Sequence, residues 1–320
     1  MPTLLEAPFT AQGFPAGIPT GGTLTFRSDD LAHALFTTGR APGDQARHGS
    51  ASLWEFIHRA SLIPAYLRRT STRAIHKSAL AQDLDRSEKV GLSYALGQAM
   101  TAIYCREQLG VDFLMHVDRY ATRHGVTFGL GRKRPDLFGM TLPGDWIVAE
   151  AKGRSNGMER GLPAQLAGQK SMIKSINGTK PTVALGCVSS FPVLYSGVWD
   201  RLRVDVVDPP QEPEAADIVV DLDRFWRAYY EPFVLAAGAG EAVDDLPGYV
   251  VSRFPGLGLQ VGLRTSIHEL LAGDEPITAD LLGSASASIA DGGEDPIGFS
   301  DGTLIETSWA DALAILDYEA

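Results

Sequence analysis

Two acidic residues and a lysine in the middle of the chain have the types and spacing that suit phosphodiester chemistry. The stretch reads RPDLFGMTLPGDWIVAEAKGR, and it holds Asp136, Glu150 and Lys152. Its Pro-Asp dipeptide and its acid-x-Lys triplet each occur nowhere else in the chain. Mg²⁺ prefers oxygen ligands, usually one or two carboxylates with water and substrate phosphate. We therefore expect Asp136 and Glu150 to bind Mg²⁺ or Mn²⁺, together with a backbone carbonyl of Ala149 or Ala151.

The period of a β-strand explains how the acid and the lysine would act together. Strand side chains alternate between two faces, so positions 150 and 152 share one face and the alanines point to the other. On that face the Lys152 ammonium can orient an attacking water or stabilise negative charge beside the metal. The competing interpretation is structural: a Pro-Asp turn followed by an exposed strand with a Glu/Lys pair.

Periodic segments on both sides predict the elements that position this motif. Apolar residues at helical spacing predict a helix over 85–107. The segment 146–150 is apolar on both faces until it reaches the acid, which is typical of a buried strand with a polar end. The other predicted elements are a strand over 111–117, an extended segment 127–130 leading into the motif, a helix over 162–176 with Asn177-Gly178 at its end, and strands over 181–188 and 202–207.

This order of elements, with RPD…EAK on the second and third strands, resembles the PD-(D/E)xK nuclease superfamily, which has the restriction-endonuclease-like fold. The resemblance covers about residues 80–210. It implies an α/β core of helix, three strands, helix and strand, and metal-dependent cleavage of DNA, less often RNA. Asp136 matches the motif aspartate, Glu150 the second acid and Lys152 the lysine.

Many members of that superfamily carry an acid on the first helix and a polar residue, often Gln, on the helix after the motif. Glu88 and either Gln165 or Gln169 occupy the corresponding places. Glu88 also fits a capping box with Asp85 as the N-cap, and the two roles are compatible. Gln169 falls on the apolar stripe of its predicted helix, where it contacts either the site or, equally, the core.

The distribution of charge favours a polyanionic ligand, although the total does not. The net charge is −11, which opposes nonspecific binding to nucleic acid. Residues 61–180 nevertheless hold 18 Lys and Arg against 10 Asp and Glu, whereas residues 181–320 hold 6 against 24. Basic residues concentrated around a phosphodiesterase-like motif indicate a nucleic-acid surface, for which the expected contacts are Arg132, Lys133, Arg134, Arg154 and Gln165.

The distribution of charged residues and of proline- and glycine-rich segments along the chain suggests three regions. An N-terminal extension over 1–60, partly irregular, precedes a nuclease-like domain over 61–207, and an acidic C-terminal α/β region over 208–320 begins with the linker-like DPPQEPEAA. The acidic region is a candidate surface for a protein partner, and homo-oligomerisation stays open. In the C-terminal region we expect a strand at 218–220, a helix over 222–237 interrupted at Pro232, and a glycine-rich strand at 256–263.

Several sequence features are missing. No apolar run approaches the roughly 20 residues that span a bilayer, and the N-terminus lacks the pattern of a secretory signal. Cys105 and Cys187 are the only cysteines, which favours a cytoplasmic protein without a disulfide framework. Neither a Gly-x-Ser-x-Gly elbow nor a Walker-type phosphate loop occurs.

The sequence therefore predicts a Mg²⁺-dependent nuclease. We expect a DNA endonuclease, and the resemblance suggests a setting in restriction or anti-phage defence. The alternative is a non-catalytic nuclease-like module that binds nucleic acid or assembles with partner proteins. A third interpretation is a scaffold whose acidic region binds a basic protein.

Overall fold

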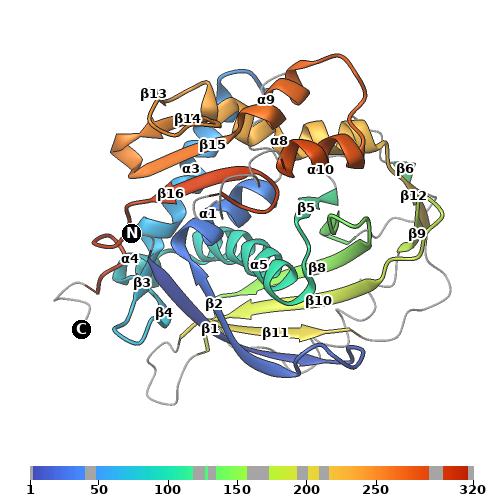
Figure 1. Ribbon diagram of the computed structural model, residues 1–320. Helices are drawn as coiled ribbons and strands as arrows, with labels where there is room; N and C mark the ends of the chain where they lie inside the picture. The colour runs from blue at the N-terminus through green and yellow to red at the C-terminus, as the bar shows by residue number, and fades with distance from the viewer. Residues whose placement is uncertain are drawn as a thin grey trace.

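The main feature of the protein is a curled seven-stranded sheet that wraps around one long helix (Figure 1). The computed structural model describes residues 3–39, 48–117, 127–128, 135–156, 173–192, 201–208, 216–287 and 298–315. In spatial order the sheet contains β2 (Gly21–Arg27), β1 (Leu4–Gln12), β11 (Arg203–Val207), β10 (Val183–Ser190), β8 (Trp146–Arg154), β7 (Leu137–Met140) and β5 (Phe113–His116). The expected α/β class is confirmed at this general level.

The pairing of the strands places β8 at the centre of the part that carries the motif. β5, β7 and β8 form an antiparallel meander, and β10 then joins β8 in parallel. Residues 146–151 of β8 are buried without alternation, as expected for a strand covered on both faces. The strands predicted at 111–117, 146–150, 181–188 and 202–207 correspond to β5, β8, β10 and β11.

The predicted helix over 85–107 is confirmed as α5 (Arg86–Leu109). Asp85 caps its N-terminus by accepting hydrogen bonds from the Ser87 and Glu88 amides, and Gly110 ends it in the left-handed conformation. The apolar stripe faces the sheet and is buried, and α5 contacts both β8 and β10.

Glycines let α5 approach β8 at backbone distance. A Cβ added to Gly153 would lie 1.6 Å from the carbonyl oxygen of Ser93, and one added to Gly97 would lie 2.5 Å from the Gly153 nitrogen. No side chain fits between these backbones, so both positions require glycine. The contact brings the first turns of the helix beside the end of β8 that holds Lys152.

The N-terminal sixty residues contribute ordered elements in their described part. β1 pairs in parallel with β11, and β2 returns antiparallel to β1, so this segment widens the same sheet. α1 (Ser28–Thr37) packs against α5 and α3 (Ala51–Tyr66) against α1. A two-stranded sheet of β3 (Leu67–Arg69) and β4 (Ile75–Lys77), followed by the short helix α4 (Ala79–Asp83), leads to α5.

The described part of the C-terminal region forms a second, four-stranded sheet. Its antiparallel strands follow the order β13 (Glu241–Val243), β14 (Tyr249–Phe254), β15 (Leu259–Arg264) and β16 (Thr303–Thr307). α8 (Leu222–Ala237) and α9 (Thr265–Ala272) pack against this sheet, and α10 (Ala279–Ala287) packs against α9 (Figure 1).

Two expectations in this region need correction. α8 runs through Pro232 without interruption, because the proline is buried on the same face as the aromatic residues that dock the helix and packing outweighs one lost hydrogen bond. The glycine-rich segment forms a short 3₁₀ helix, η1 (Pro255–Leu257), before β15 begins at Leu259.

The helix predicted over 162–176 is wrong at its C-terminal end. Ile173–Ile176 is a strand, β9, in a small sheet with β12 (Ala216–Val219) and β6 (Thr127–Phe128), whereas 162–172 lie outside the described residues. Asn177 and Gly178 both have positive φ. An Asn-Gly pair reads equally well as a helix end or as a tight turn, and here it is the turn.

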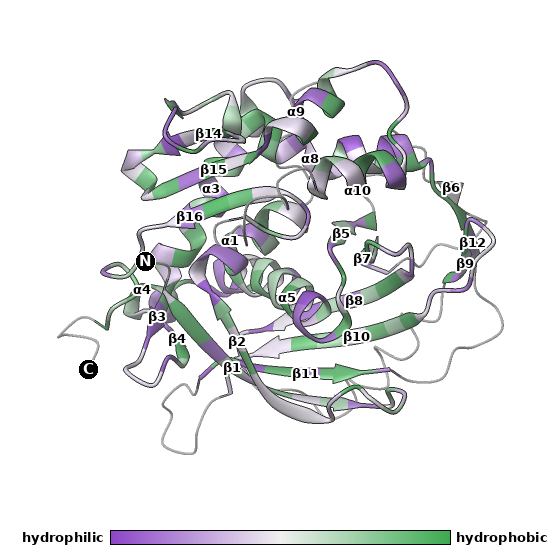
Figure 2. Ribbon diagram, viewed as in Figure 1, coloured by the Kyte–Doolittle hydropathy of each residue, from purple (hydrophilic) through white to green (hydrophobic). Residues whose placement is uncertain are grey.

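One continuous hydrophobic core joins both sheets. It extends from Leu5 to Leu313 and includes α5, α8 and the central strands. In Figure 2 the apolar colour is clear on β10 and β11, whereas α5 and α8 are mixed. Aromatic side chains of α8 reach the main sheet: Phe225 packs edge-on against Phe138 and Trp146. The acidic C-terminal region therefore shares a core with the part of the chain that carries the motif.

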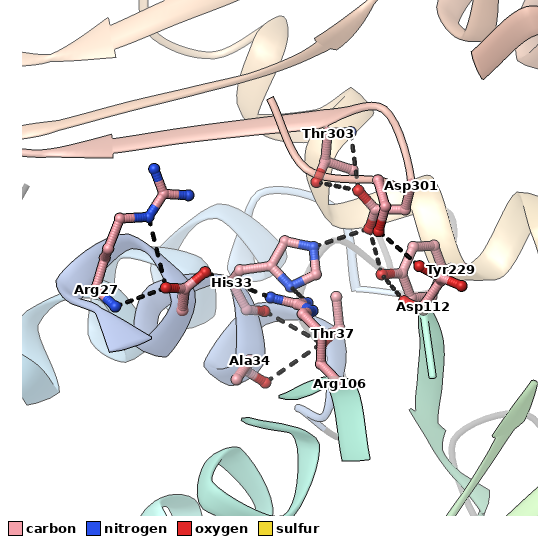
Figure 3. Close-up of polar contacts among 11 residues, drawn as sticks. Arg27, His33, Ala34, Thr37, Arg106, Asp112, Tyr229, Asp301 and Thr303 are labelled. Carbon is pink, nitrogen blue, oxygen red and sulfur yellow. Dashed lines mark hydrogen bonds and ion pairs between the residues drawn. The ribbon is translucent and has the colours of Figure 1, made fainter. Parts of the chain in front are cut away.

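A buried polar network also crosses this junction (Figure 3). His33 of α1 lies 2.9 Å through Nε2 from Asp301 Oδ2, and its Nδ1 accepts a hydrogen bond from Arg106 of α5. Asp301 also accepts hydrogen bonds from the Tyr229 hydroxyl of α8 and from Thr303. Because arginine only donates, His33 is the neutral tautomer that carries its proton on Nε2.

Candidate active site

The antiparallel pairing of β7 with β8 brings the three motif residues together. Leu137 pairs with Ala149, so the residue before it, Asp136, lies across from Glu150. Strand alternation places Lys152 on the same face as Glu150. Residues fourteen positions apart in the sequence thus meet at the end of the meander, as the motif predicts.

The polar contacts among these residues form a compact cluster. Lys152 Nζ lies 2.5 Å from Glu150 Oε1 and 3.9 Å from Asp136 Oδ2. The backbone N–H of Ala151 donates to Asp136 Oδ2 over 3.1 Å. The lysine therefore bridges both carboxylates, and the strand backbone holds the aspartate in place.

Glu150 is the buried member of the cluster. Its side chain is 2% exposed, whereas those of Asp136 and Lys152 are 23% and 26% exposed. Burial, and then the neighbouring carboxylate of Asp136, raise the pKa of Glu150 above its usual value, and the Lys152 ammonium opposes this shift. Glu150 Oε2 is buried and has no hydrogen-bond partner within the described part of the chain. The single positive charge of Lys152 therefore does not fully neutralise the two carboxylates, and it leaves Glu150 Oε2 without a hydrogen bond among the described residues.

This donor set fits a hard divalent cation. A cation beside Asp136 and Glu150 would neutralise two repelling carboxylates and give the buried Oε2 a partner. Among the residues that the structure describes, no group of three or more His, Cys, Asp or Glu is placed to hold a metal. The site thus offers two carboxylates, within the one or two that Mg²⁺ commonly takes from a protein. The carbonyl contribution of Ala149 or Ala151 stays a prediction.

A cleft of about 200 Å³ opens at the cluster. Asp136, Lys152 and Arg154 line it from the sheet, and Val90, Ser93 and Tyr94 line it from α5. The close approach of the Ser93 backbone to Gly153 fixes the position of α5 relative to β8 on this side of the cleft. The cleft gives a substrate access to Lys152 and Asp136, which are each about a quarter exposed.

The other predicted site residues have different placements. Arg154 lines the cleft, in agreement with a role near the substrate. Glu88 accepts a hydrogen bond from the Asp85 amide over 3.2 Å, which confirms the capping box, and its role at the metal stays a prediction. Arg132, Lys133, Arg134, Gln165 and Gln169 lie outside the described residues.

Sequence reasoning did not identify two further groups beside the cleft. The Tyr94 hydroxyl lies 3.0 Å from Nε2 of His116, a buried residue at the end of β5. Lys77 of β4 donates to the carbonyl of Ser155, which lines the cleft, over 2.8 Å. Burial, and then the charge of Lys89, lower the pKa of Lys77 to about 8. The sequence indicates these groups only indirectly, since His116 is the last residue of the strand that precedes the motif.

Comparisons with protein-family models, with curated proteins and with solved structures found no match. In the described part of the chain, every helix is too short or too polar to cross a membrane.

Proposed function

We propose that the protein is a Mg²⁺- or Mn²⁺-dependent nuclease that hydrolyses phosphodiester bonds, with DNA as the expected substrate and endonucleolytic cleavage as the expected mode. The observation that carries the proposal is the cluster of Asp136, Glu150 and Lys152 at the mouth of a cleft, with a buried Glu150 oxygen that has no hydrogen-bond partner among the described residues. The order α5, β5, β7, β8 and then a parallel β10 agrees with the first helix and the strands of the expected core. The helix expected between β8 and β10 lies outside the described residues except for 173–176, which form β9. A role in restriction or anti-phage defence is part of this proposal and rests on the resemblance alone.

Each residue of the cluster has a defined part in such a reaction. When bound, the metal would lower the pKa of a water and polarise the scissile phosphoryl group. Asp136 and Glu150 would hold the cation, and the Ala151 amide would keep the Asp136 carboxylate oriented. Lys152, about a quarter exposed, would stabilise negative charge that develops on the phosphate. Arg154 would bind a neighbouring phosphate from the sheet side.

Cleavage assays with single variants test this proposal. The full chain is incubated with plasmid DNA, single-stranded DNA and RNA in Mg²⁺, Mn²⁺ or EDTA, and Asp136→Asn, Glu150→Gln and Lys152→Ala are compared with wild type. A suitable control is Glu6→Gln, which removes an acid from a more exposed ion pair with Arg73. We expect metal-dependent cleavage that the three site variants lose and the control retains. Binding without cleavage in every metal would instead favour the non-catalytic nuclease-like module.

A further inference from the structure

A second groove lies on the other side of α5 from the cleft. It has a volume of about 310 Å³ and runs between α3 and the first turns of α5, within the size range of pockets that bind small organic groups. Apolar and aromatic residues of both helices line it, among them Leu62 and Tyr66 of α3 and Leu92 and Tyr94 of α5. His58 and two oppositely charged residues, Arg59 and Glu88, complete the lining.

Tyr94 belongs to both cavities. It lines the groove and also the cleft that contains Asp136 and Lys152. Its hydroxyl bonds to the buried His116, while 43% of the residue remains exposed. The hydrogen bond holds the ring in one orientation, so the exposed ring surface is a preorganised platform at the junction of the two cavities.

Trp54 extends the aromatic surface beyond the groove. It lies one helical turn before His58 on α3, so both project from the same face of that helix. Trp54 is 68% exposed, whereas the other described tryptophans, Trp146, Trp226 and Trp309, are at most 5% exposed. An aromatic side chain this exposed beside an apolar groove marks an interaction surface rather than a core position.

The chain segment that supplies one wall of the groove is basic in sequence. The segment 51–77, which contains α3, β3 and β4, holds five Lys and Arg and one Asp or Glu in a chain whose net charge is −11. Of these basic residues Arg59 lines the groove, where it lies 2.6 Å from Glu55. Aromatic platforms beside an arginine are the combination that binds single-stranded nucleic acid. Bases of a duplex are already stacked and cannot use such platforms, so the occupant must be unpaired.

We propose that the groove between α3 and α5 binds an unpaired nucleic-acid strand that continues past Tyr94 into the cleft. The direction of the strand rests on the proposed nuclease function, but binding in the groove does not. Bases stack on Tyr94 and Trp54, and the substrate is single-stranded or locally unpaired next to the scissile bond. The groove thus selects the structure of the nucleic acid rather than its sequence.

Gly91 offers a direct way to fill the groove. A Cβ added to this helical glycine meets nothing within 4 Å, so Gly91→Leu places an isobutyl group in the groove without displacing a neighbour. Gly283 of α10 also has open space at its Cβ, and Gly283→Leu is the matched control. Both substitutions replace glycine by a better helix former, so neither should lower the melting temperature.

The experiment measures binding separately from cleavage. Fluorescence anisotropy follows a labelled oligothymidylate, and a duplex of the same length, on the full chain carrying Glu150→Gln in EDTA at low salt. We expect the single strand to bind more tightly than the duplex. Gly91→Leu, Tyr94→Ala and Trp54→Ala should each weaken single-strand binding, on the order of tenfold for a lost stacking platform. Tyr94→Phe, which keeps the ring but loses the hydrogen bond to His116, should bind more tightly than Tyr94→Ala and more weakly than the parent. Gly283→Leu should bind like the parent.

The outcomes separate this proposal from the nuclease function. Unchanged single-strand affinity in both Gly91→Leu and Tyr94→Ala, or no binding of the oligonucleotide at all, would overturn the groove proposal even if wild type cleaves DNA. Loss of binding in those variants, in a protein that cleaves no substrate, would support the groove and refute the nuclease function. A duplex that binds as tightly as the single strand and responds equally to Gly91→Leu would also overturn it.

Discussion

At the scale of single residues, the main finding is that Glu150 lies buried beside a second carboxylate. Its raised pKa means that ionisation costs more in the folded than in the unfolded protein. At pH values above the ordinary pKa of 4.5, Glu150 ionises more readily in the unfolded than in the folded chain. Ionisation of Glu150 therefore lowers the free energy of unfolding of the metal-free protein. A cation bound at Asp136 and Glu150 would reverse that effect.

We therefore predict opposite effects of Glu150→Gln on stability and on metal response. Without metal at pH 7, the variant should melt a few degrees above wild type, because it removes a buried charge and keeps a similar shape. Millimolar Mg²⁺ or Mn²⁺ should raise the melting temperature of wild type but not that of the variant. Differential scanning calorimetry measures both. An equal metal-induced shift in the two proteins would place the cation elsewhere.

Substitutions of Lys152 should affect the cleavage rate and not the affinity for nucleic acid. Lys152→Ala should lower the cleavage rate by about 100-fold or more, because it removes a charge beside the scissile phosphate, and it should leave nucleic-acid affinity within a few-fold of wild type. Lys152→Arg should not fully restore the rate, since a planar guanidinium places its charge differently from a compact ammonium. Single-turnover rates and anisotropy measure the two quantities. Wild-type turnover in Lys152→Ala would support the alternative of a structural Glu/Lys pair.

At the scale of elements, the contact between α5 and β8 determines the shape of the cleft. Gly153→Ala should destabilise the protein by about 1–3 kcal/mol or more, because its Cβ would lie 1.6 Å from the Ser93 carbonyl oxygen and the helix must move. The matched change Gly91→Ala, in open space, should be neutral or stabilising. Urea unfolding gives both free energies. A tolerated alanine at position 153 would mean that the helix and the strand are not locked at this point.

The elements around the motif could be predicted because local signals agreed with the fold. The Asp85 cap and the apolar stripe specify α5, and the unbroken apolar run specifies the buried β8. β1 was not predicted although Leu5, Ala7, Phe9 and Ala11 alternate with more exposed residues. Pro8 within the strand, and the prolines and glycines that flank it, are typical of turns and obscured the alternation. β9 could not be predicted, since its partner β12 lies some forty residues away and only tertiary pairing makes it a strand.

The site was predictable in part for the same reason. Asp136, Glu150 and Lys152 meet because period-2 alternation and an antiparallel register can be read from the sequence. Tyr94 and His116 were not identified, because their contact depends on how α5 is set over the sheet. That position follows from the glycine approach at Gly97 and Gly153, which has no local sequence signature.

At the scale of the whole molecule, the His33–Asp301 network connects the helices around the main sheet to the turn before β16 (Figure 3). Burial, and then the guanidinium of Arg106, lower the pKa of His33, and the Asp301 carboxylate opposes them. The charged groups that face the imidazole are thus Arg106 of α5, Asp30 of its own helix and Asp301, with the Tyr229 hydroxyl of α8 on the aspartate. A proton on Nδ1 would point at Arg106.

This network predicts a loss of stability in mild acid. His33 stays neutral in the folded protein below its unfolded pKa of about 6.5, where the unfolded chain takes up the proton. The free energy of unfolding should therefore fall as the pH drops below 6.5, by up to about 1.4 kcal/mol per pH unit from this residue. Urea unfolding between pH 5 and 7.5 measures how steeply the free energy of unfolding changes with pH.

His33→Gln should be less stable than wild type, but its free energy of unfolding should depend less steeply on pH. His268→Gln, at a half-buried position on α9, serves as the control. A slope that His33→Gln leaves unchanged would contradict this account.

The acidic C-terminal region shares its hydrophobic core with the main sheet. Phe225 of α8 packs on the main sheet, so the described residues of this region, 216–287 and 298–315, contribute to the stability of the part that holds the cleft. Docking of a protein partner on its acidic surface remains a prediction, best tested with the intact chain.

The most direct test of the central claim is the rate of plasmid cleavage by wild type as Mg²⁺ is titrated into EDTA-treated protein, beside Glu150→Gln under the same conditions. We predict no cleavage without metal, a rate that rises and saturates with Mg²⁺ in wild type, and a rate at least about 100-fold lower in Glu150→Gln at every concentration. Cleavage that is equal in EDTA and Mg²⁺, or equal in the two proteins, would contradict a metal site formed by Asp136 and Glu150.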